Sequence, residues 1–172
     1  MQIRAFEADD EAGVDALLKT AFPGPGEARL VTALRAADAD TLELVAVDHG
    51  TVVGTVMFSP VTARAEDADD LFGVGLGPVA VVPEHQSRGI GVALIEAGLT
   101  YLATLGVPWC VVLGEPDYYK RFDFVPAATW NWSWAGDPEG QFAAAFQARA
   151  LNGAPPDAGV ATLHYHPAFL GV

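Results

Sequence analysis

The sequence is poor in cysteine and in long apolar runs, and both shortages limit where the protein works. Cys110 is the only cysteine among 172 residues, so no disulfide can form within the chain. A single cysteine is typical of a reducing compartment. No stretch approaches the roughly 20 apolar residues that a membrane-spanning helix needs, and residues 1–7 lack the apolar core of a signal peptide. We therefore expect a cytoplasmic protein without membrane contact.

Positive charge is also scarce. Nine Lys and Arg residues stand against 22 Asp and Glu residues, which gives a net charge of −13. A protein that binds a nucleic acid backbone neutralises phosphates with clustered Lys and Arg, so we expect no nucleic acid partner. The acidic surface either serves solubility alone or attracts a cationic partner.

Several catalytic patterns are absent as well. The chain contains no Walker A, H-E-x-x-H or G-x-S-x-G sequence, which argues against the nucleotide, zinc-protease and serine-hydrolase chemistry that these patterns carry. His164 and His166 have the alternate spacing of metal ligands on a strand, but no further ligand stands beside them. We therefore predict no metal site.

What the chain does contain is typical of a globular protein. Hydrophobic residues make up 51% and charged residues 18% of it, and its length suits one domain. No repeat or linker divides it. We expect a single domain over residues 1–172, with residues 125–172 completing its sheet.

The first half alternates between strand and helix patterns. Apolar spacing and turn residues predict a strand at 2–6, a helix from Asp9 or Asp10 to Phe22, a helix at 27–37, and a hairpin of strands 42–47 and 51–59. A strand at 71–82, a helix from Gly89 to Gly106 and a strand at 108–113 follow. Strand, helix and strand in this order indicate a right-handed parallel crossover.

The last third is expected to contain a short helix at 115–122, a strand from Phe124, a strand carrying Trp130, Trp132 and Trp134, a helix at 137–150 and a final strand at 160–165. Phe142 and Phe146 stand four residues apart, so we expect the tryptophan face to pack on that helix; it could instead wall a ligand pocket. The fold class is α/β (α+β), with a mixed, mostly antiparallel sheet and helices on both faces.

The most informative stretch is 79–92. Pro83 ends an apolar strand, a short polar loop follows, and Gly89 and Gly91 lead into the next helix. The first amides of a helix have no partner within it and lie at the positive end of the helix dipole. Such a helix start binds anions readily.

Two motifs resemble a known family. Ala80–Gly91 resembles the motif V-x-P-x-x-(Q/R)-x-x-G-x-(G/A) of the GNAT superfamily of N-acetyltransferases. Tyr118–Phe124 resembles the family's (F/Y)-Y-x-x-x-G-F segment. The order of elements is similar from Gln2 to about Phe124. The resemblance implies the GNAT fold, with residues 125–172 on the acceptor side.

The resemblance also implies acetyl-CoA as cosubstrate. Its pyrophosphate would lie on residues that match the family motif: Gln86, Ser87, Arg88, Gly89, Ile90, Gly91 and Val92. The backbone of Ala80 and Val81 would pair with the pantetheine arm, and the Val81 amide would polarise the thioester carbonyl. The Arg88 side chain either contacts phosphate or faces solvent.

Tyr119 matches the family position that supplies a proton to the leaving thiolate, and the alternative is a packed tyrosine. A free phenol has a pKa near ~10. Some members of the family carry a glutamate as base on the strand at 71–82, but here this strand carries no acid. The sequence does not show the base, and Glu115, Asp117 or a chain of waters could take its place. Two positions depart from the family. Asp123 replaces a glycine of the turn, and the segment Gly114-Glu115-Pro116 stands where many relatives have an asparagine that tethers the cofactor arm.

The resemblance implies transfer of an acetyl group to a primary amine of a small molecule or peptide, and the acidic surface would suit a cationic acceptor. The alternatives are a non-catalytic acyl-CoA-binding or sensing module of the same fold, and a nucleotide-binding protein whose loop only mimics the motif. Assembly into a homodimer is compatible with the sequence.

Overall fold

The structure is a computed structural model that describes all 172 residues, and its chain divides into two units. The first unit contains residues 1–59, 77–101 and 167–172, and the second contains residues 60–76 and 102–166. The strands β3 (Thr51–Ala65) and β4 (Leu71–Val81) and the helix α3 (Ile90–Thr104) contribute residues to both. The single domain expected from length and composition stays a prediction.

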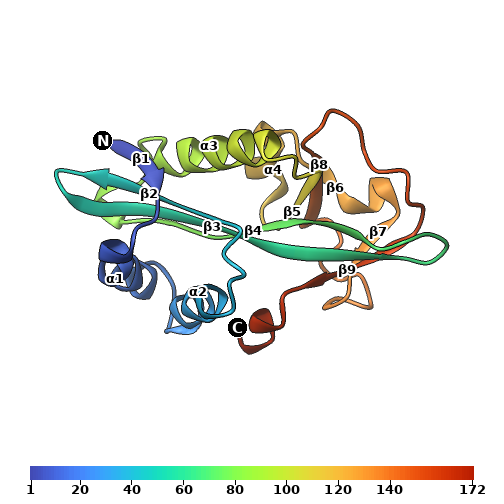
Figure 1. The fold of residues 1–172 in the computed structure, drawn as a ribbon, viewed down its shortest axis with the longest axis horizontal. Coiled ribbons are helices and arrows are strands. Elements are labelled where there is room, and N and C mark those ends of the chain that lie inside the picture. Colours follow the sequence, from blue (N-terminus) through green and yellow to red (C-terminus); the bar gives the residue numbers. More distant parts are fainter. The chain divides into compact units, whose positions relative to one another are not determined.

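The first unit has helices on both faces of its strands. It contains β1 (Gln2–Ala5), the 3-10 helix η1 (Ala8–Asp10), α1 (Glu11–Ala21), α2 (Gly26–Ala36), β2 (Leu42–Asp48) and the 3-10 helices η2 (Pro83–His85) and η5 (Pro167–Gly171). β2 is antiparallel to both β1 and β3. In Figure 1, α1 and α2 lie on one side of these strands and α3 lies on the other.

The core of this unit follows from the helical spacing of its apolar residues. α1 and α2 bury one stripe each against the strands, through Val14, Leu17, Leu18, Leu30, Val31, Leu34, Val45, Met57 and Ala80. On the other face α3 comes close to β3, because a Cβ at Gly98 would collide with the Phe58 ring. Before α1, the Asp10 carboxylate accepts a hydrogen bond from the Glu7 amide at 2.8 Å, which closes the turn that starts the helix.

The second unit contains the parallel strands that the crossover predicts. Its further elements are β5 (Trp109–Leu113), α4 (Pro116–Tyr119), η3 (Lys120–Phe122), β6 (Val125–Pro126), η4 (Ala127–Trp130), β7 (Trp132–Trp134), β8 (Phe146–Ala150) and β9 (Ala161–Tyr165). β4–β5 and β7–β9 are parallel, whereas β3–β9, β5–β8 and β6–β8 are antiparallel. The predicted class, a mixed and mostly antiparallel sheet with helices on both faces, is confirmed.

The helix predicted at 137–150 is wrong. Residues 137–145 form turns, and residues 146–150 form β8. The Asp137 carboxylate accepts hydrogen bonds from the backbone amides of Gln141 at 2.9 Å and Phe142 at 2.7 Å, so the chain satisfies these amides without a helix. β8 then pairs with β5, a partner distant in sequence. Phe146 is buried while Phe142 is 55% exposed, so the two do not share a buried helix face.

The predicted tryptophan strand is partly wrong. Trp130 ends η4, and Asn131 adopts the left-handed region with φ of 60°, so only Trp132 and Trp134 share β7. Trp134 stacks on Phe146 of β8 with ring centroids 6.5 Å apart. Trp132 instead packs edge-on against Trp109 of β5 at 5.0 Å. The tryptophans therefore pack on strands of the sheet rather than on a helix.

None of the helices is long and apolar enough to cross a membrane. No group of three or more His, Cys, Asp or Glu side chains in the 172 residues is arranged to hold a metal ion.

Candidate functional site

The loop after β4 is tied to the strand by hydrogen bonds of its own residues. η2 begins at Pro83, which has no N–H to leave unpaired, and the His85 amide donates to the Val82 carbonyl at 3.0 Å. The side chain of Gln86 turns back, and its Nε2 donates to the Val81 carbonyl at 3.0 Å. Gln86 therefore closes the loop with its side chain, a role that the motif alone does not reveal.

Two left-handed residues lead from the loop into α3. Ser87 has φ of 63° and Gly89 has φ of 80°. The first backbone bond of the helix is donated by Ala93 to the Gly89 carbonyl at 2.9 Å, so the amides of Ile90, Gly91 and Val92 lie ahead of it. A left-handed residue followed by a helix start brings successive N–H groups together into an anion-binding concavity. The expected pyrophosphate residues from Ser87 to Val92 lie in this segment, whereas the amide of Gln86, also expected there, donates to the Pro83 carbonyl at 3.3 Å.

The Arg88 side chain is exposed, and it forms no ion pair within the chain. It is the one cation between Gln86 and Val92, beside a helix start that favours negative charge. The guanidinium is thus available to a phosphate without breaking an existing contact.

The end of β4 presents backbone rather than side chains. The parallel register with β5 comprises Val74, Gly75 and Leu76. Pro78, which follows, carries no N–H for a ladder. The Ala80 side chain is 7% exposed and belongs to the core beneath α1 and α2. The main chain is therefore the part of Ala80 that remains available to a ligand, and the contact of Ala80 and Val81 with pantetheine stays a prediction.

Tyr119 belongs to the second unit, where it ends α4 and is 8% exposed. Its ring packs edge-on against Tyr118 at 5.0 Å and Phe124 at 5.8 Å, and at a tilt against Phe122 at 6.1 Å. Burial, followed by the proximity of Tyr118 and Cys110, raises the pKa of Tyr119 to about 12. The phenol therefore keeps its proton at neutral pH.

Gly114 makes room for Tyr119. A Cβ at Gly114 would overlap the Tyr119 ring. The glycine is held in place because its amide donates to the Ala145 carbonyl at 3.0 Å and its carbonyl accepts from Nε2 of the buried Gln147 at 3.2 Å. A side chain at position 114 is thus excluded by the position of the tyrosine ring, a contact that motif spacing does not show.

Asp123 preserves the turn that a glycine usually makes. It has φ of 63° and ψ of 22°, in the left-handed region, and its amide donates to the Lys120 carbonyl at 3.1 Å. Aspartate tolerates this region better than most residues because its short side chain can bond locally. The two candidate bases, Glu115 and Asp117, are exposed at the start of α4.

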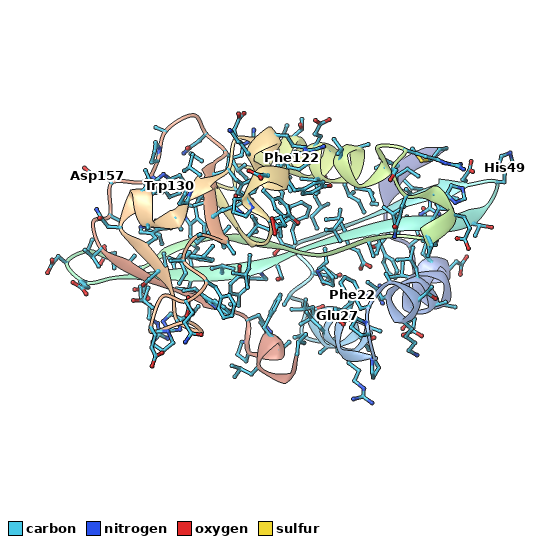
Figure 2. All side chains as sticks on the ribbon, turned by 180° about the vertical axis from the view of Figure 1, so that it is seen from behind. Phe22, Glu27, His49, Phe122, Trp130 and Asp157 are labelled. Atoms are coloured by element: carbon cyan, nitrogen blue, oxygen red, sulfur yellow. The ribbon has the colours of Figure 1, made fainter.

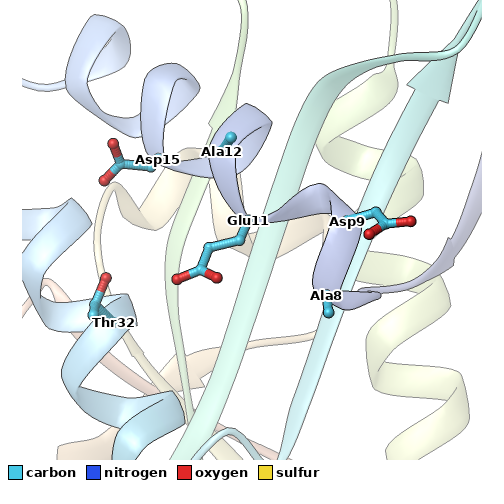
Figure 3. A pocket seen from close by; sticks show the side chains of 6 residues that line it. All are labelled: Ala8, Asp9, Glu11, Ala12, Asp15 and Thr32. Atoms are coloured by element: carbon cyan, nitrogen blue, oxygen red, sulfur yellow. The ribbon is translucent and has the colours of Figure 1, made fainter.

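An acidic hollow of about 440 Å³ lies between η1, α1 and α2 (Figure 3). Its lining comprises Ala8, Asp9, Glu11, Ala12, Asp15 and Thr32. Asp15 is engaged with Lys19 at 2.7 Å, and Figure 3 shows the Glu11 carboxylate on the side of Thr32 while Asp9 points the other way. In the sequence these acids are indistinguishable from ordinary helix-start residues, and this is why motif analysis missed them.

The fold and the loop define a class of protein. The sequence profile of the acetyltransferase (GNAT) domain matches residues 2–127. The chain therefore belongs to the GNAT family, and it is an N-acetyltransferase.

Particular relatives come from bacteria. The chain is 42% identical over 129 residues to the N-acetyltransferase YhbS of Escherichia coli K12, which covers 74% of this chain and 75% of YhbS. It is 33% identical over 124 residues to the E. coli N-acetyltransferase YjhQ, covering 71% of this chain and 68% of YjhQ.

Two solved structures are similar along nearly the whole chain. The structure of E. coli YhbS in complex with CoA has a TM-score of 0.83 and 35% identity, over 98% of this chain and 91% of that one. The structure of a GNAT family acetyltransferase from Brucella melitensis in complex with acetyl-CoA has a TM-score of 0.77 and 36% identity, over 98% of this chain and 97% of that one.

Proposed function

We propose that this protein transfers the acetyl group of acetyl-CoA to a primary amine of a small molecule or peptide. The observation that carries the proposal is the start of α3, where Ser87 and Gly89 are left-handed and the amides of residues 90–92 precede the first helical bond. The two similar structures, crystallised with CoA and with acetyl-CoA, support the same cosubstrate here.

The cofactor-binding role falls on the backbone of two segments. The amides of Ser87, Arg88, Gly89, Ile90, Gly91 and Val92 bind the pyrophosphate, and the Arg88 side chain adds a charge-assisted contact. The Gln86 amide already donates to the Pro83 carbonyl at 3.3 Å, so Gln86 supports the site through its side chain. The main chain of Ala80 and Val81 pairs with the amides of the pantetheine arm as a further strand would. The Val81 carbonyl already accepts from Gln86, so its amide is the group left to polarise the thioester carbonyl.

The proposed role of Tyr119 is hydrogen-bond donation to the leaving sulfur. A phenol with a pKa of about 12 holds its proton more firmly than a thiol, whose pKa is near ~8.5. Such a phenol stabilises the negative charge that develops on sulfur without being ionised itself. The proton that finally remains on the thiol then comes from the acceptor amine, through Glu115, Asp117 or water.

The acceptor is proposed to be cationic before it reacts. A primary alkylamine has a pKa near ~10.4 and is protonated in neutral solution. The net charge of −13 and the acidic hollow beside Glu11 favour the approach of such a molecule. The amine loses its proton before attack, because only the neutral form is a nucleophile.

The test is a screen of amines for release of free CoA thiol from acetyl-CoA. We expect release with at least one primary alkylamine, and we expect Tyr119→Phe to lower kcat roughly 100-fold without weakening acetyl-CoA binding, since one transition-state donor is lost. The control is Tyr101→Phe, which alters a half-exposed tyrosine of α3. A non-catalytic acyl-CoA-binding module would bind acetyl-CoA and release no thiol with any amine.

A further inference from the structure

A histidine side chain joins the loop at residues 82–89 to the hairpin of β2 and β3. His85 is the last residue of η2, and its Nε2 lies 3.3 Å from Oδ2 of Asp48, the last residue of β2. A carboxylate only accepts hydrogen bonds, so Nε2 carries the proton and donates. The contact spans 37 positions of the sequence and ties the loop to a strand end.

The contact with Asp48 is what orients the imidazole. The ring is 25% exposed, and its other nitrogen, Nδ1, is buried without a hydrogen-bond partner. Leaving a buried polar atom unpaired is unfavourable, and such atoms in a folded protein call for an explanation. Nδ1 lacks a partner and Nε2 has one, so the bond to Asp48 is the hydrogen bond that holds the ring. Because His85 belongs to the loop, this bond also fixes the position of the loop.

Asp48 has a second histidine neighbour that serves as an internal comparison. His49 Nδ1 lies 3.3 Å from the other carboxylate oxygen, but its side chain is 94% exposed. Figure 2 shows His49 at the outer tip of the hairpin. The hydrogen bond from His85 is the largest of the contributions that lower the pKa of Asp48, ahead of those from His49. The same carboxylate thus contacts one histidine of the loop and one that belongs to the hairpin alone.

Few other bonds hold the loop in its conformation. Gln86 bonds back to Val81, and the Val82 amide donates to the Val53 carbonyl of β3 at 2.9 Å. Both of these lie at the strand end of the loop. Two turn bonds shape the loop locally, from the His85 amide to the Val82 carbonyl at 3.0 Å and from the Gln86 amide to the Pro83 carbonyl at 3.3 Å. The His85 contact with Asp48 is the one that ties this part of the loop to a neighbouring strand, just before the left-handed Ser87 and Gly89.

We propose that His85 is a positioning residue for the coenzyme A site, and that through Asp48 it holds the loop in the conformation in which the amides of residues 87–92 converge. This inference rests on the proposed function, because it assumes that these amides bind the pyrophosphate. A protein that binds only in one of its conformations loses affinity in proportion to the fraction of molecules outside it. Without the contact, the loop populates other conformations and CoA binds more weakly.

The expected effect is modest, because the pair is partly exposed. Side-chain contacts at the protein surface are weak, and we expect the loss of one to change the affinity by at most about fivefold. We expect His85→Ala to weaken CoA binding about fivefold. In His85→Gln the amide nitrogen reaches as far as Nε2 and can donate to Asp48, so we expect its affinity to stay within about twofold of the unsubstituted protein.

The experiment is calorimetric titration of CoA into the full chain, which needs no acceptor. The matched control is His49→Ala, which removes the exposed neighbour of the same carboxylate and is expected to leave the dissociation constant unchanged. Asp48→Ala should weaken CoA binding at least as much as His85→Ala does, and the double variant should be no weaker than Asp48→Ala alone, because both changes remove the contact between His85 and Asp48. Melting temperatures without CoA monitor folding.

Each outcome of these titrations either supports or overturns the inference about His85. Weakening in His85→Ala and Asp48→Ala, recovery in His85→Gln and no change in His49→Ala support the inference. A lower melting temperature in His85→Ala with unchanged CoA affinity overturns it, because the contact is then merely structural. Equal weakening in His49→Ala also overturns it. Absence of CoA binding to the unsubstituted protein overturns the proposed function and this inference together.

Discussion

The loop at residues 82–89 and the cluster around Tyr119 differ in the groups that they offer to a ligand. In the loop the expected ligand contacts come from backbone amides, oriented by two left-handed residues and by the start of α3. In the Tyr119 cluster, formed by Tyr118, Tyr119, Phe122 and Phe124, the expected contact is one hydroxyl held by aromatic packing. The loop depends on which residues permit left-handed backbone, whereas the cluster depends on the space that each ring occupies. The loop should therefore respond to changes of conformation and the cluster to changes of volume.

The largest effect is expected at Gly114, where volume matters most. Gly114→Asn introduces a side chain whose Cβ would overlap the Tyr119 ring. Overpacking typically costs about 1–3 kcal/mol, so we expect the free energy of unfolding in denaturant to fall by that amount. Gly140→Asn is the matched control, because Gly140 has no atom within 4 Å of its Cβ position and asparagine tolerates its φ of 72°. Equal stability of the two variants would contradict the steric account.

The next effect is expected at Gly89, where conformation matters. Its φ of 80° lies in the left-handed region, and nothing lies within 4 Å of its Cβ position, so Gly89→Ala introduces strain without a collision. Left-handed backbone costs other residues about 1–2 kcal/mol. If the loop relaxes to escape this strain, CoA affinity falls about tenfold in calorimetry. If Gly89→Ala binds CoA with the same affinity as the unsubstituted protein, CoA binding does not depend on the backbone conformation of the loop.

A smaller effect is expected at Gln86, whose side chain bonds the Val81 carbonyl at 3.0 Å. Gln86→Ala removes one exposed hydrogen bond that closes the loop, worth about 0.5–1 kcal/mol. CoA binding should weaken about three- to fivefold. Gln141→Ala, an exposed glutamine of the second unit, should leave the affinity unchanged.

The smallest effect is expected at Asp123. It already has the left-handed geometry of a glycine, with φ of 63°. Asp123→Gly relieves strain but also increases the freedom of the unfolded chain, so the two effects oppose each other. We expect the free energy of unfolding to change by less than about 0.5 kcal/mol. A change above about 1 kcal/mol in denaturant unfolding would show that Asp123 has a further role in the turn.

The sequence predicted the start of α3 well because the residues that set its backbone are local. Pro83 ends the strand, Gly89 permits the left-handed turn, and α3 begins at Ile90, one residue after the expected start. The parallel pairing of β4 and β5 also follows from local order, since a helix joins the two strands. The mixed, mostly antiparallel sheet was predicted for the same reason.

The region at 137–150 could not be predicted in this way. Phe142 and Phe146 have helical spacing, but the Asp137 side chain satisfies the amides of the turn and β8 gains its partner from β5. The turn and the strand both depend on contacts that the spacing of apolar residues does not reveal. The role of Gly114 likewise depends on where the Tyr119 ring lies, and the bond from His85 joins residues 37 positions apart.

The most direct test of the central claim is an NMR titration of the amide signals of the ¹⁵N-labelled protein with CoA. The account predicts that the amides of residues 87–92 at the start of α3 shift most, because they bind the pyrophosphate. It also predicts that Gly89→Ala reduces these shifts at equal CoA concentration. Saturable CoA binding that leaves the amides of residues 87–92 unshifted would contradict the account.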